Sequence, residues 1–258
     1  MSTRVPDLKG LTVLVTRPAH QAQALCEAIT AAGGKAVAFP VLEITDPPDL
    51  AALDRLLDEL DRFDIAIFIS ANAVEKAMPR ILARGEFPSH IQIAAVGEKT
   101  AQALGAYNLP VTLRPRENYD SEGLLALPAL QAVRGKRIVI FRGVGGRELL
   151  AEVLQARSAE VAYAECYQRS RPALDGSGLP RQGIDIAVVT SCEGLENLFA
   201  MVGAAARPWL CATPMVVMSE RMRESARRLG VTAPVLAVEE ASDAGLLAQL
   251  KHYAGTRT

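Results

Sequence analysis

Gly10-Leu-Thr-Val-Leu-Val-Thr-Arg17 returns later in the chain as Gly135-Lys-Arg-Ile-Val-Ile-Phe-Arg142. Each copy is a short apolar run that ends in an arginine, followed by a segment of helical periodicity and then by an extended segment. Gly135 follows Gly10 by 125 residues, and the same offset aligns Leu25 with Leu150. The pattern indicates an internal duplication.

Two further pairs follow in the same order. Phe63-Asp-Ile-Ala-Ile-Phe-Ile-Ser70 matches Ile184-Asp-Ile-Ala-Val-Val-Thr-Ser191, and Gly97-Glu-Lys-Thr100 matches Ser219-Glu-Arg-Met222. A repeat of this length is too long for a short-repeat solenoid. It predicts two related lobes, because each unit is large enough to hold a core of its own.

Composition narrows the class of protein. The chain has 258 residues, of which 50% are hydrophobic and only 5% aromatic, which is typical of α/β proteins. The net charge is -1 with both signs interspersed, so we expect no nucleic-acid surface.

Cysteine and histidine usage argues against a metal site. The four cysteines have no CxxC spacing and the three histidines lie far apart, so we expect neither metal nor disulfide framework. The segment Met1–Asp7 has no apolar leader region, and no apolar run is long enough to cross a membrane. The sequence therefore predicts a soluble cytoplasmic protein that does not contact a membrane.

Short apolar runs alternate with segments of helical period, which predicts parallel sheets flanked by helices. The expected strands are 11–15, 36–39, 65–69, 91–96, 111–113, 137–141, 160–164, 186–190, 215–218 and 235–237. The expected helices are 21–32, 51–60, 73–83, 100–106, 123–130, 148–157, 194–202, 222–229 and 243–253. The predicted fold class is α/β, with two related lobes.

The repeated polar residues all follow predicted strands. Arg17 and Arg142 end their strands, Ser70 and Ser191 end theirs, and the Gly97 segment follows another. Ligands of open parallel sheets lie at the carboxyl ends of the strands. Two lobes with these edges facing one another would form a polar cleft.

The ordered motifs resemble those of the uroporphyrinogen-III synthase family, over nearly the whole chain. The segments that carry the resemblance are Val15-Thr-Arg-Pro18, Phe68-Ile-Ser-Ala-Asn-Ala-Val74, Ala95-Val-Gly-Glu-Lys-Thr-Ala101, the loop from Arg142 to Leu150, Val161-Ala-Tyr-Ala-Glu-Cys-Tyr167 and Thr190-Ser191. Each motif is short, and their order and spacing together make the likeness specific.

The resemblance implies a division of the chain that differs from the repeat boundary. One lobe would comprise residues 1–38 and 171–258, and the other residues 44–164. Two linker strands, residues 39–43 and 165–170, would join them and permit hinge motion.

The resemblance also implies a reaction. Members of the family cyclise hydroxymethylbilane, with loss of water and inversion of the terminal pyrrole ring, to give uroporphyrinogen III without a cofactor. Pyrrole nitrogen lone pairs expel the hydroxyl, so the substrate supplies most of the electronic push. Because spontaneous closure gives the type I isomer, positioning should matter more than acid–base strength.

The resemblance places a tyrosine, Tyr167, in the second linker as the catalytic candidate, where a phenol would assist departure of the hydroxyl by hydrogen bonding. The alternative is a tyrosine that only packs between the lobes. The expected contacts to substrate carboxylates come from strand-to-helix turns, whose backbone N–H groups bind anions. The candidate substrate-binding residues are Arg17, Ser70, Ala71, Asn72, Gly97, Lys99, Thr100, Arg142, Gly143, Gly145, Thr190, Ser191, Cys192, Ser219 and Arg221.

Each candidate also has a plain structural interpretation. The hydroxyl and amide side chains could be ordinary helix N-caps, and the two arginines could brace their own loops instead of clamping carboxylates. Lys99 and Arg221 could lie on a solvated face. Ala71 and Cys192 depart from the usual residues of the family, so a role there belongs to the backbone. The glycines at 143 and 145 would let the backbone approach a propionate.

Two other classes of function compete with the synthase. A non-catalytic bilobal binding protein for an anionic metabolite would show the same repeat and polar edges, but would need no Tyr167. A nucleotide or sugar transferase would need a phosphate loop or metal-binding carboxylates. The sequence offers neither clearly, and Gly143-Val-Gly-Gly146 lacks the full GxGxxG spacing. For the synthase we expect a monomer that makes transient contact with hydroxymethylbilane synthase.

Overall fold

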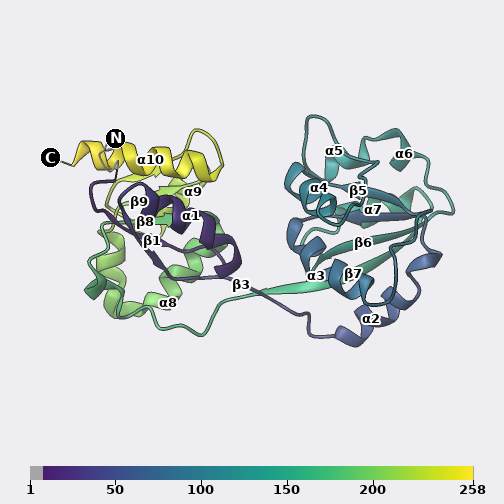
Figure 1. Ribbon diagram of the computed structural model, residues 1–258, viewed down its shortest axis with the longest axis horizontal. Helices are drawn as coiled ribbons and strands as arrows, with labels where there is room; N and C mark the ends of the chain where they lie inside the picture. The colour runs from purple at the N-terminus through teal and green to yellow at the C-terminus, as the bar shows by residue number, and fades with distance from the viewer. Residues whose placement is uncertain (1–7, 258) are drawn as a thin grey trace, which may run out of the picture. The chain divides into compact units, whose positions relative to one another are not determined.

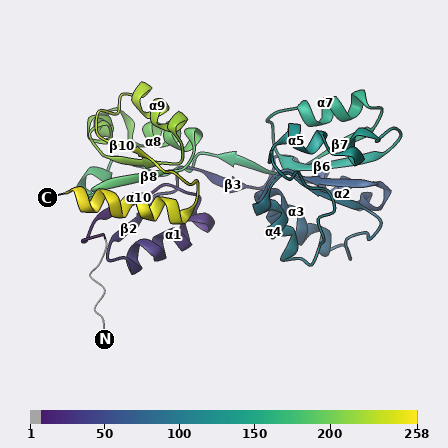
Figure 2. The same cartoon turned by 90° about the horizontal axis from the view of Figure 1, so that it is seen from above.

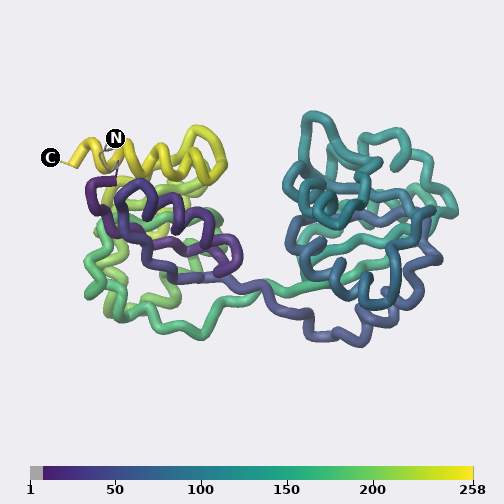
Figure 3. Tube along the Cα trace, in the orientation of Figure 1, coloured from purple at the N-terminus to yellow at the C-terminus, as the bar shows by residue number. Residues whose placement is uncertain are grey.

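The structure, a computed structural model, describes residues 8–257 (Figure 1). The chain divides into two compact units: unit 1 contains the residues up to Glu43 and those from Ser170 onward, and unit 2 is Ile44–Arg169. Figure 3 traces the path from unit 1 into unit 2 and back. Met1–Asp7 lies outside the described residues. The expectation of no leader rests on this segment, and the predicted lobe 1–38 begins with it.

Unit 2 is built on a five-stranded sheet in the order β3-β7-β6-β4-β5. Its strands are β3 (Glu43–Thr45), β4 (Ile65–Phe68), β5 (Gln92–Ala95), β6 (Arg137–Gly143) and β7 (Glu160–Ser170). β4 pairs in parallel with both β5 and β6, and β6 pairs in parallel with β7. All four residues of β4 are buried, as expected of a strand covered on both faces.

Helices cover both faces of this sheet. The helices of unit 2 are α2 (Leu50–Asp58), η1 (Leu60–Arg62), α3 (Ala71–Leu82), α4 (Glu98–Gly105), α5 (Ser121–Leu125), α6 (Pro128–Gln131) and α7 (Leu149–Ala156). One core gathers apolar side chains of α2, α3 and α4, and a second gathers those of α5, α6 and α7. Figure 2 shows α5 and α7 on one side of the sheet and α3 and α4 on the other.

Unit 1 has the same three layers around the sheet β10-β9-β8-β1-β2. Its strands are β1 (Thr12–Val15), β2 (Lys35–Ala38), β8 (Ile186–Val189), β9 (Met215–Val217) and β10 (Val235–Ala237). Its helices are α1 (Ala19–Ala31), η2 (Leu179–Gln182), α8 (Cys192–Cys211), α9 (Glu220–Arg228) and α10 (Asp243–Thr256). α8 and α9 supply one core, and α1 and α10 supply the other.

The duplication is visible in the strand order. The order β9-β8-β1-β2 in unit 1 matches β5-β4-β6-β7 in unit 2, strand for strand along the sequence repeat. β1, from the start of the chain, pairs with β8 from its second half, and this pairing joins β2 and β9 to one sheet. The predicted fold class, α/β with parallel sheets flanked by helices, is confirmed.

Several predicted elements differ from the structure. Of the predicted linker strand 39–43 only Glu43 lies in a strand, β3, and the predicted linker strand 165–170 is the second half of β7. Residues 111–113, expected as a strand, form only an isolated bridge between Leu113 and Ala94, because Pro110 and Pro115 confine the extended segment on both sides. The predicted helix 123–130 is two short helices, α5 and α6, since Pro128 starts a new helix. The helix predicted for 194–202 continues to Cys211 beyond a kink at Gly203.

Candidate functional site

The carboxyl ends of the strands of unit 2 lie along one edge of its sheet, because β4, β5, β6 and β7 are all parallel. β4 and β6 are neighbours, but β4 leads through α3 to β5 on one side, and β6 leads through α7 to β7 on the other. Such a reversal of direction is where open α/β sheets bind their ligands. Ser70 and Gly143 lie at the two strand ends that flank it.

A phenol and a hydroxyl meet at this edge. The side-chain oxygens of Tyr167 and Ser70 lie 3.1 Å apart, although 97 residues separate them. Ser70 also caps α3, where its hydroxyl accepts a hydrogen bond from the Ala73 N–H at 3.1 Å. Tyr167 is only 3% exposed, so only a small part of its side chain can meet a ligand.

Arg142 holds the loop that follows β6. Its guanidinium donates hydrogen bonds to the carbonyl oxygens of Gly143 and Gly145 and lies 4.4 Å from the ring centre of Tyr163. Arg142 is only 3% exposed. These contacts are the ones expected of an arginine that braces its own loop.

The remaining candidates in unit 2 surround the starts of α3 and α4. Gly97 is the N-cap residue of α4, and its backbone is extended. Ala71, Asn72 and Gly97 are partly buried, Lys99 and Gly145 are exposed, and Thr100 is buried at 4% exposure. Backbone N–H groups at these helix starts can therefore reach a ligand more readily than the Thr100 side chain can.

Unit 1 repeats the arrangement at the switch between β1 and β8. Arg17 follows β1 and forms an ion pair with Asp243 at 2.5 Å, so here too the arginine has a partner within its own unit. Ser191 follows β8 and caps α8, accepting from the Gly194 N–H at 2.9 Å. Thr190 and Cys192 beside it are partly buried.

The start of α9 completes the unit 1 edge. Ser219 caps α9 by accepting from the Met222 N–H at 3.4 Å, and both Ser219 and Arg221 are exposed. In both units, the predicted residues thus gather at the carboxyl edge of their own sheet.

Two residues of this edge were missed by the sequence analysis. Ser242 caps α10 by accepting from the Gly245 N–H at 3.0 Å, and Asp243 is the partner of Arg17. The signal for Ser242 was present, because it directly precedes the predicted helix 243–253. The ion pair had no local signal, since its residues lie 226 positions apart.

Burial makes two of the four thiols poor nucleophiles. Burial raises the pKa of Cys166 to about 12, so its reactive thiolate form is scarce at neutral pH. Burial also raises the pKa of Cys26. Among the described residues, no group of three or more His, Cys, Asp or Glu side chains could hold a metal ion.

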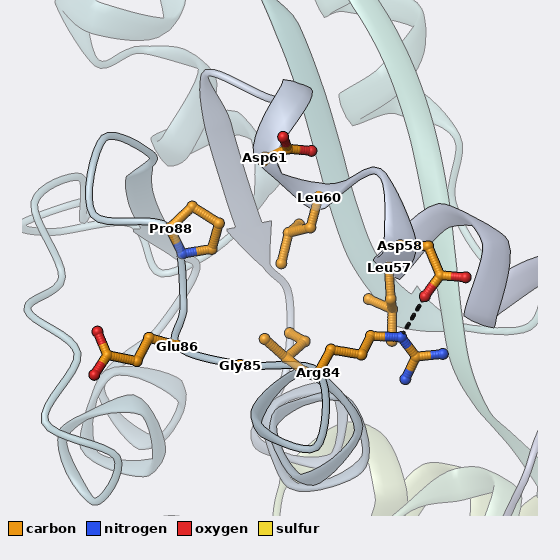
Figure 4. A pocket seen from close by; sticks show the side chains of 9 residues that line it. Leu57, Asp58, Leu60, Asp61, Arg84, Gly85, Glu86 and Pro88 are labelled. Carbon is orange, nitrogen blue, oxygen red and sulfur yellow. Dashed lines mark hydrogen bonds and ion pairs between the residues drawn. The ribbon is translucent and has the colours of Figure 1, made fainter.

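Two pockets are lined by none of the predicted residues, although the second lies at the carboxyl edge of unit 1, where α10 begins. The first, of about 370 Å³, lies beside the segments that precede β4 and β5, at the amino edge of the unit 2 sheet (Figure 4). Asp58, Asp61 and Glu86 line it, and Arg84 there bonds to Asp58 at 2.7 Å. The second, of about 290 Å³, is lined by Glu239 and Glu240. Both acidic linings would repel a polycarboxylate ligand.

The geometry defines a two-unit α/β protein in which each unit carries a polar edge of helix starts suited to an anionic small molecule. No helix among residues 8–257 is long and apolar enough to cross a membrane.

Comparison with known proteins identifies the family. A family model described as "Uroporphyrinogen-III synthase HemD" matches residues 23–248. The chain is 37% identical to uroporphyrinogen-III synthase of Salmonella typhimurium over 226 residues, which cover 85% of this chain and 92% of that protein. It is 35% identical to the Escherichia coli enzyme over the same shares of both chains. The chain belongs to the uroporphyrinogen-III synthase family, a family of enzymes of tetrapyrrole synthesis, as its motifs predicted.

Solved structures carry the same fold. A mutant uroporphyrinogen III synthase from Thermus thermophilus matches with a TM-score of 0.61 at 20% identity, covering 96% of this chain and all (100%) of that one. The Helicobacter pylori protein, described as uroporphyrinogen-III synthetase, matches with a TM-score of 0.58 at 15% identity, covering 94% and 99%. None of these comparisons supports the alternative of a non-catalytic binding protein.

Proposed function

We propose that this chain converts hydroxymethylbilane into uroporphyrinogen III, using the polar edges of its two sheets to hold the substrate. Family membership supports the reaction, and the pair formed by Tyr167 and Ser70 is the observation that carries the chemical step. The reaction balances internally: the departing hydroxyl takes up a proton and leaves as water, and ring closure releases a proton from a pyrrole carbon.

In this proposal Tyr167 helps the hydroxyl to leave. Ser70 already accepts a hydrogen bond from the Ala73 N–H, so its own proton is available to Tyr167 at 3.1 Å. The phenol proton is then free to point to the departing hydroxyl, and Ser70 stabilises the charge that develops on the phenol oxygen. Substrate lone pairs supply the push, so the phenol assists a step that proceeds slowly without it.

Substrate carboxylates would bind at the helix starts. The first N–H groups of a helix have no intrahelical partner, and the helix dipole favours an anion there. The starts of α3 and α4 in unit 2, and of α8 and α9 in unit 1, follow strand ends on the ligand edge of each sheet. This assigns binding mainly to backbone groups near Ser70, Gly97, Ser191 and Ser219. Arg17 and Arg142 then act chiefly by shaping the edges.

We also propose that the protein acts in the cytoplasm as a monomer and meets hydroxymethylbilane synthase transiently. Free hydroxymethylbilane closes spontaneously to the type I isomer. Direct passage of the substrate from one enzyme to the other would therefore raise the yield of the type III isomer. The chain crosses between the units only at Glu43–Ile44 and Arg169–Ser170, and two such connections would permit movement between the units.

Freshly generated hydroxymethylbilane tests the proposal. The purified protein should yield type III porphyrin, resolved by chromatography after oxidation, where a sample without enzyme yields type I. Tyr167→Phe should lower kcat about 10- to 100-fold, because the ring stays and only the donor is lost. Tyr107→Phe is the matched control, since Tyr107 packs against the same core away from Ser70.

The outcomes separate the two parts of the proposal. Type I product alone from folded protein would overturn the synthase reaction for this chain. Type III product formed at the native rate by Tyr167→Phe would leave the reaction in place and remove the role of the phenol.

A further inference from the structure

The backbone of Gly143 lies against the ring of Tyr167. A β-carbon added at Gly143 would stand 2.7 Å from the ring carbon Cε2 and 2.8 Å from Cζ. Carbon atoms that are not bonded to one another pack at about 3.5–4.0 Å, so such a side chain and the ring cannot share this space. Gly143 is not among the glycines with positive φ, so the close approach and not the backbone conformation requires a glycine here.

Tyr167 is held at both ends against this backbone. The Val144 N–H donates to its carbonyl oxygen at 2.7 Å, and its phenol oxygen lies 3.1 Å from the Ser70 hydroxyl. The side chain is buried in the same core as Phe68 and Phe141. A side chain at position 143 would therefore have to push the far end of the ring away, and with it the phenol that reaches Ser70.

The backbone at the end of β6, around Gly143, is held in place by Arg142. The register of β6 against β7 shifts between Arg142 and Gly143, and the Arg142 guanidinium donates to the Gly143 carbonyl oxygen at 3.1 Å. The cation lies over Tyr163, which precedes Tyr167 on β7. Arg142 thus fixes the strand end that forms one wall of the space occupied by the ring.

We infer that Gly143 is a positioning residue for the reaction: its missing side chain leaves the space in which the Tyr167 ring lies, so that the phenol reaches Ser70. This inference rests on the catalytic role proposed for Tyr167. From its sequence, Gly143 was expected to let the backbone approach a substrate propionate, whereas in the structure the ring of Tyr167 fills the side-chain space at that position. In unit 1, the offset of 125 sets Leu42 opposite Tyr167, so the phenol belongs to one copy of the repeat alone.

A cycle of variants tests the inference. Gly143→Ala should lower kcat for type III product about tenfold, with KM within about twofold of the native value, because it misplaces a donor without removing a substrate contact. In the Tyr167→Ala background the same alanine should change neither constant, since the ring is gone. If Gly143 instead meets a substrate carboxylate, KM will rise by the same factor in both backgrounds, and the inference is overturned.

Thermal unfolding supplies a second readout that does not depend on turnover. Gly143→Ala should lower Tm by about 5 °C beside the native tyrosine and by much less beside Tyr167→Ala. An equal loss in both backgrounds overturns the packing argument. If Gly143→Ala fails to fold, recovery of folding in the double variant supports the inference and failure of both overturns it. Gly105→Ala is the control, because a β-carbon there meets no atom within 4 Å.

The two proposals fail differently. A native kcat in Tyr167→Phe would refute the catalytic role of the phenol, yet the Tm difference between backgrounds would still report the packing of Gly143 against the ring. A large effect of Tyr167→Phe with no effect of Gly143→Ala would keep the phenol and refute the positioning role.

Discussion

One aspartate at the amino edge of each sheet, Asp64 or Asp185, makes the same structural contact in both copies of the repeat. Asp64 accepts a hydrogen bond from the backbone N–H of Arg137 at 2.8 Å, and Asp185 accepts one from Thr12 at 2.8 Å. Asp64 directly precedes β4 and Asp185 directly precedes β8, and each accepts a hydrogen bond from the first residue of the neighbouring strand, β6 or β1. Each also bonds to a cation, Lys136 or Arg257. The aspartate of the repeated Phe/Ile-Asp-Ile-Ala motif therefore has a structural role: it links the starts of two neighbouring strands.

The interactions of the Asp64 carboxylate in unit 2 should make the stability of the fold depend on pH. The hydrogen bond from the Arg137 N–H, supported by Lys136, holds the pKa of Asp64 below its usual range. A lowered folded pKa stabilises the fold above the unfolded value, near 4, and this stability is lost as pH falls through the folded pKa. We expect Asp64→Asn to lower the free energy of unfolding by about 1 kcal/mol at pH 7, because the exposed part of the side chain is screened by solvent.

Urea unfolding at pH 7 and at about pH 3 would measure the effect, since the difference from the native protein should shrink in acid. Asp61→Asn, an exposed change at the same edge, is the control. A difference of equal size at both pH values would mean that the charge of Asp64 is not its cause. The yield of type III product should stay native, because Asp64 lies at the edge away from Ser70.

At the scale of elements, serine caps mark the helix starts at the carboxyl edges of the two sheets. Ser70, Ser191, Ser219 and Ser242 each cap a helix that follows a strand. A serine after an apolar run is a local signal, so the sequence could predict these starts within a few residues. It could not predict the continuation of α8, because Gly203 interrupts the pattern that would have extended it.

A substitution at Gly203 tests whether the backbone conformation at the kink in α8 requires glycine. Its backbone, with φ 67° and ψ 179°, lies in a region that only glycine adopts without strain, and a β-carbon there meets no atom within 4 Å. Gly203→Ala should therefore lower the free energy of unfolding by about 1–3 kcal/mol through the backbone alone. Denaturant unfolding would measure it. Gly178→Ala, in equally open space at φ -82°, should cost far less; equal costs would contradict the explanation.

At the scale of the whole molecule, the two units differ in how the chain builds them. Both cores of unit 2 use only residues within Ile44–Arg169, whereas both cores of unit 1 combine residues from before Glu43 and after Ser170. Unit 2 is continuous in sequence. The sheet and cores of unit 1 are complete only when its two separate segments pair through β1 and β8.

This difference predicts the behaviour of fragments. A protein of residues 44–169 should fold alone and show a cooperative thermal transition by circular dichroism, because its sheet and cores are complete. Residues 170–258 alone should not, since β8 would lack its partner β1. A fragment 44–169 without a cooperative transition would show that unit 2 depends on unit 1 for its stability.

The sequence by itself determined the class of fold, the repeat, the family and most helix starts, since burial periodicity and capping act over a few residues. Tertiary structure alone decided which strands pair across the chain. It also decided that Arg17 meets Asp243 and that the ring of Tyr167 fills the space beside Gly143 to reach Ser70. These contacts join residues far apart in sequence, and they form only when shared sheets bury their apolar faces, which no local pattern encodes.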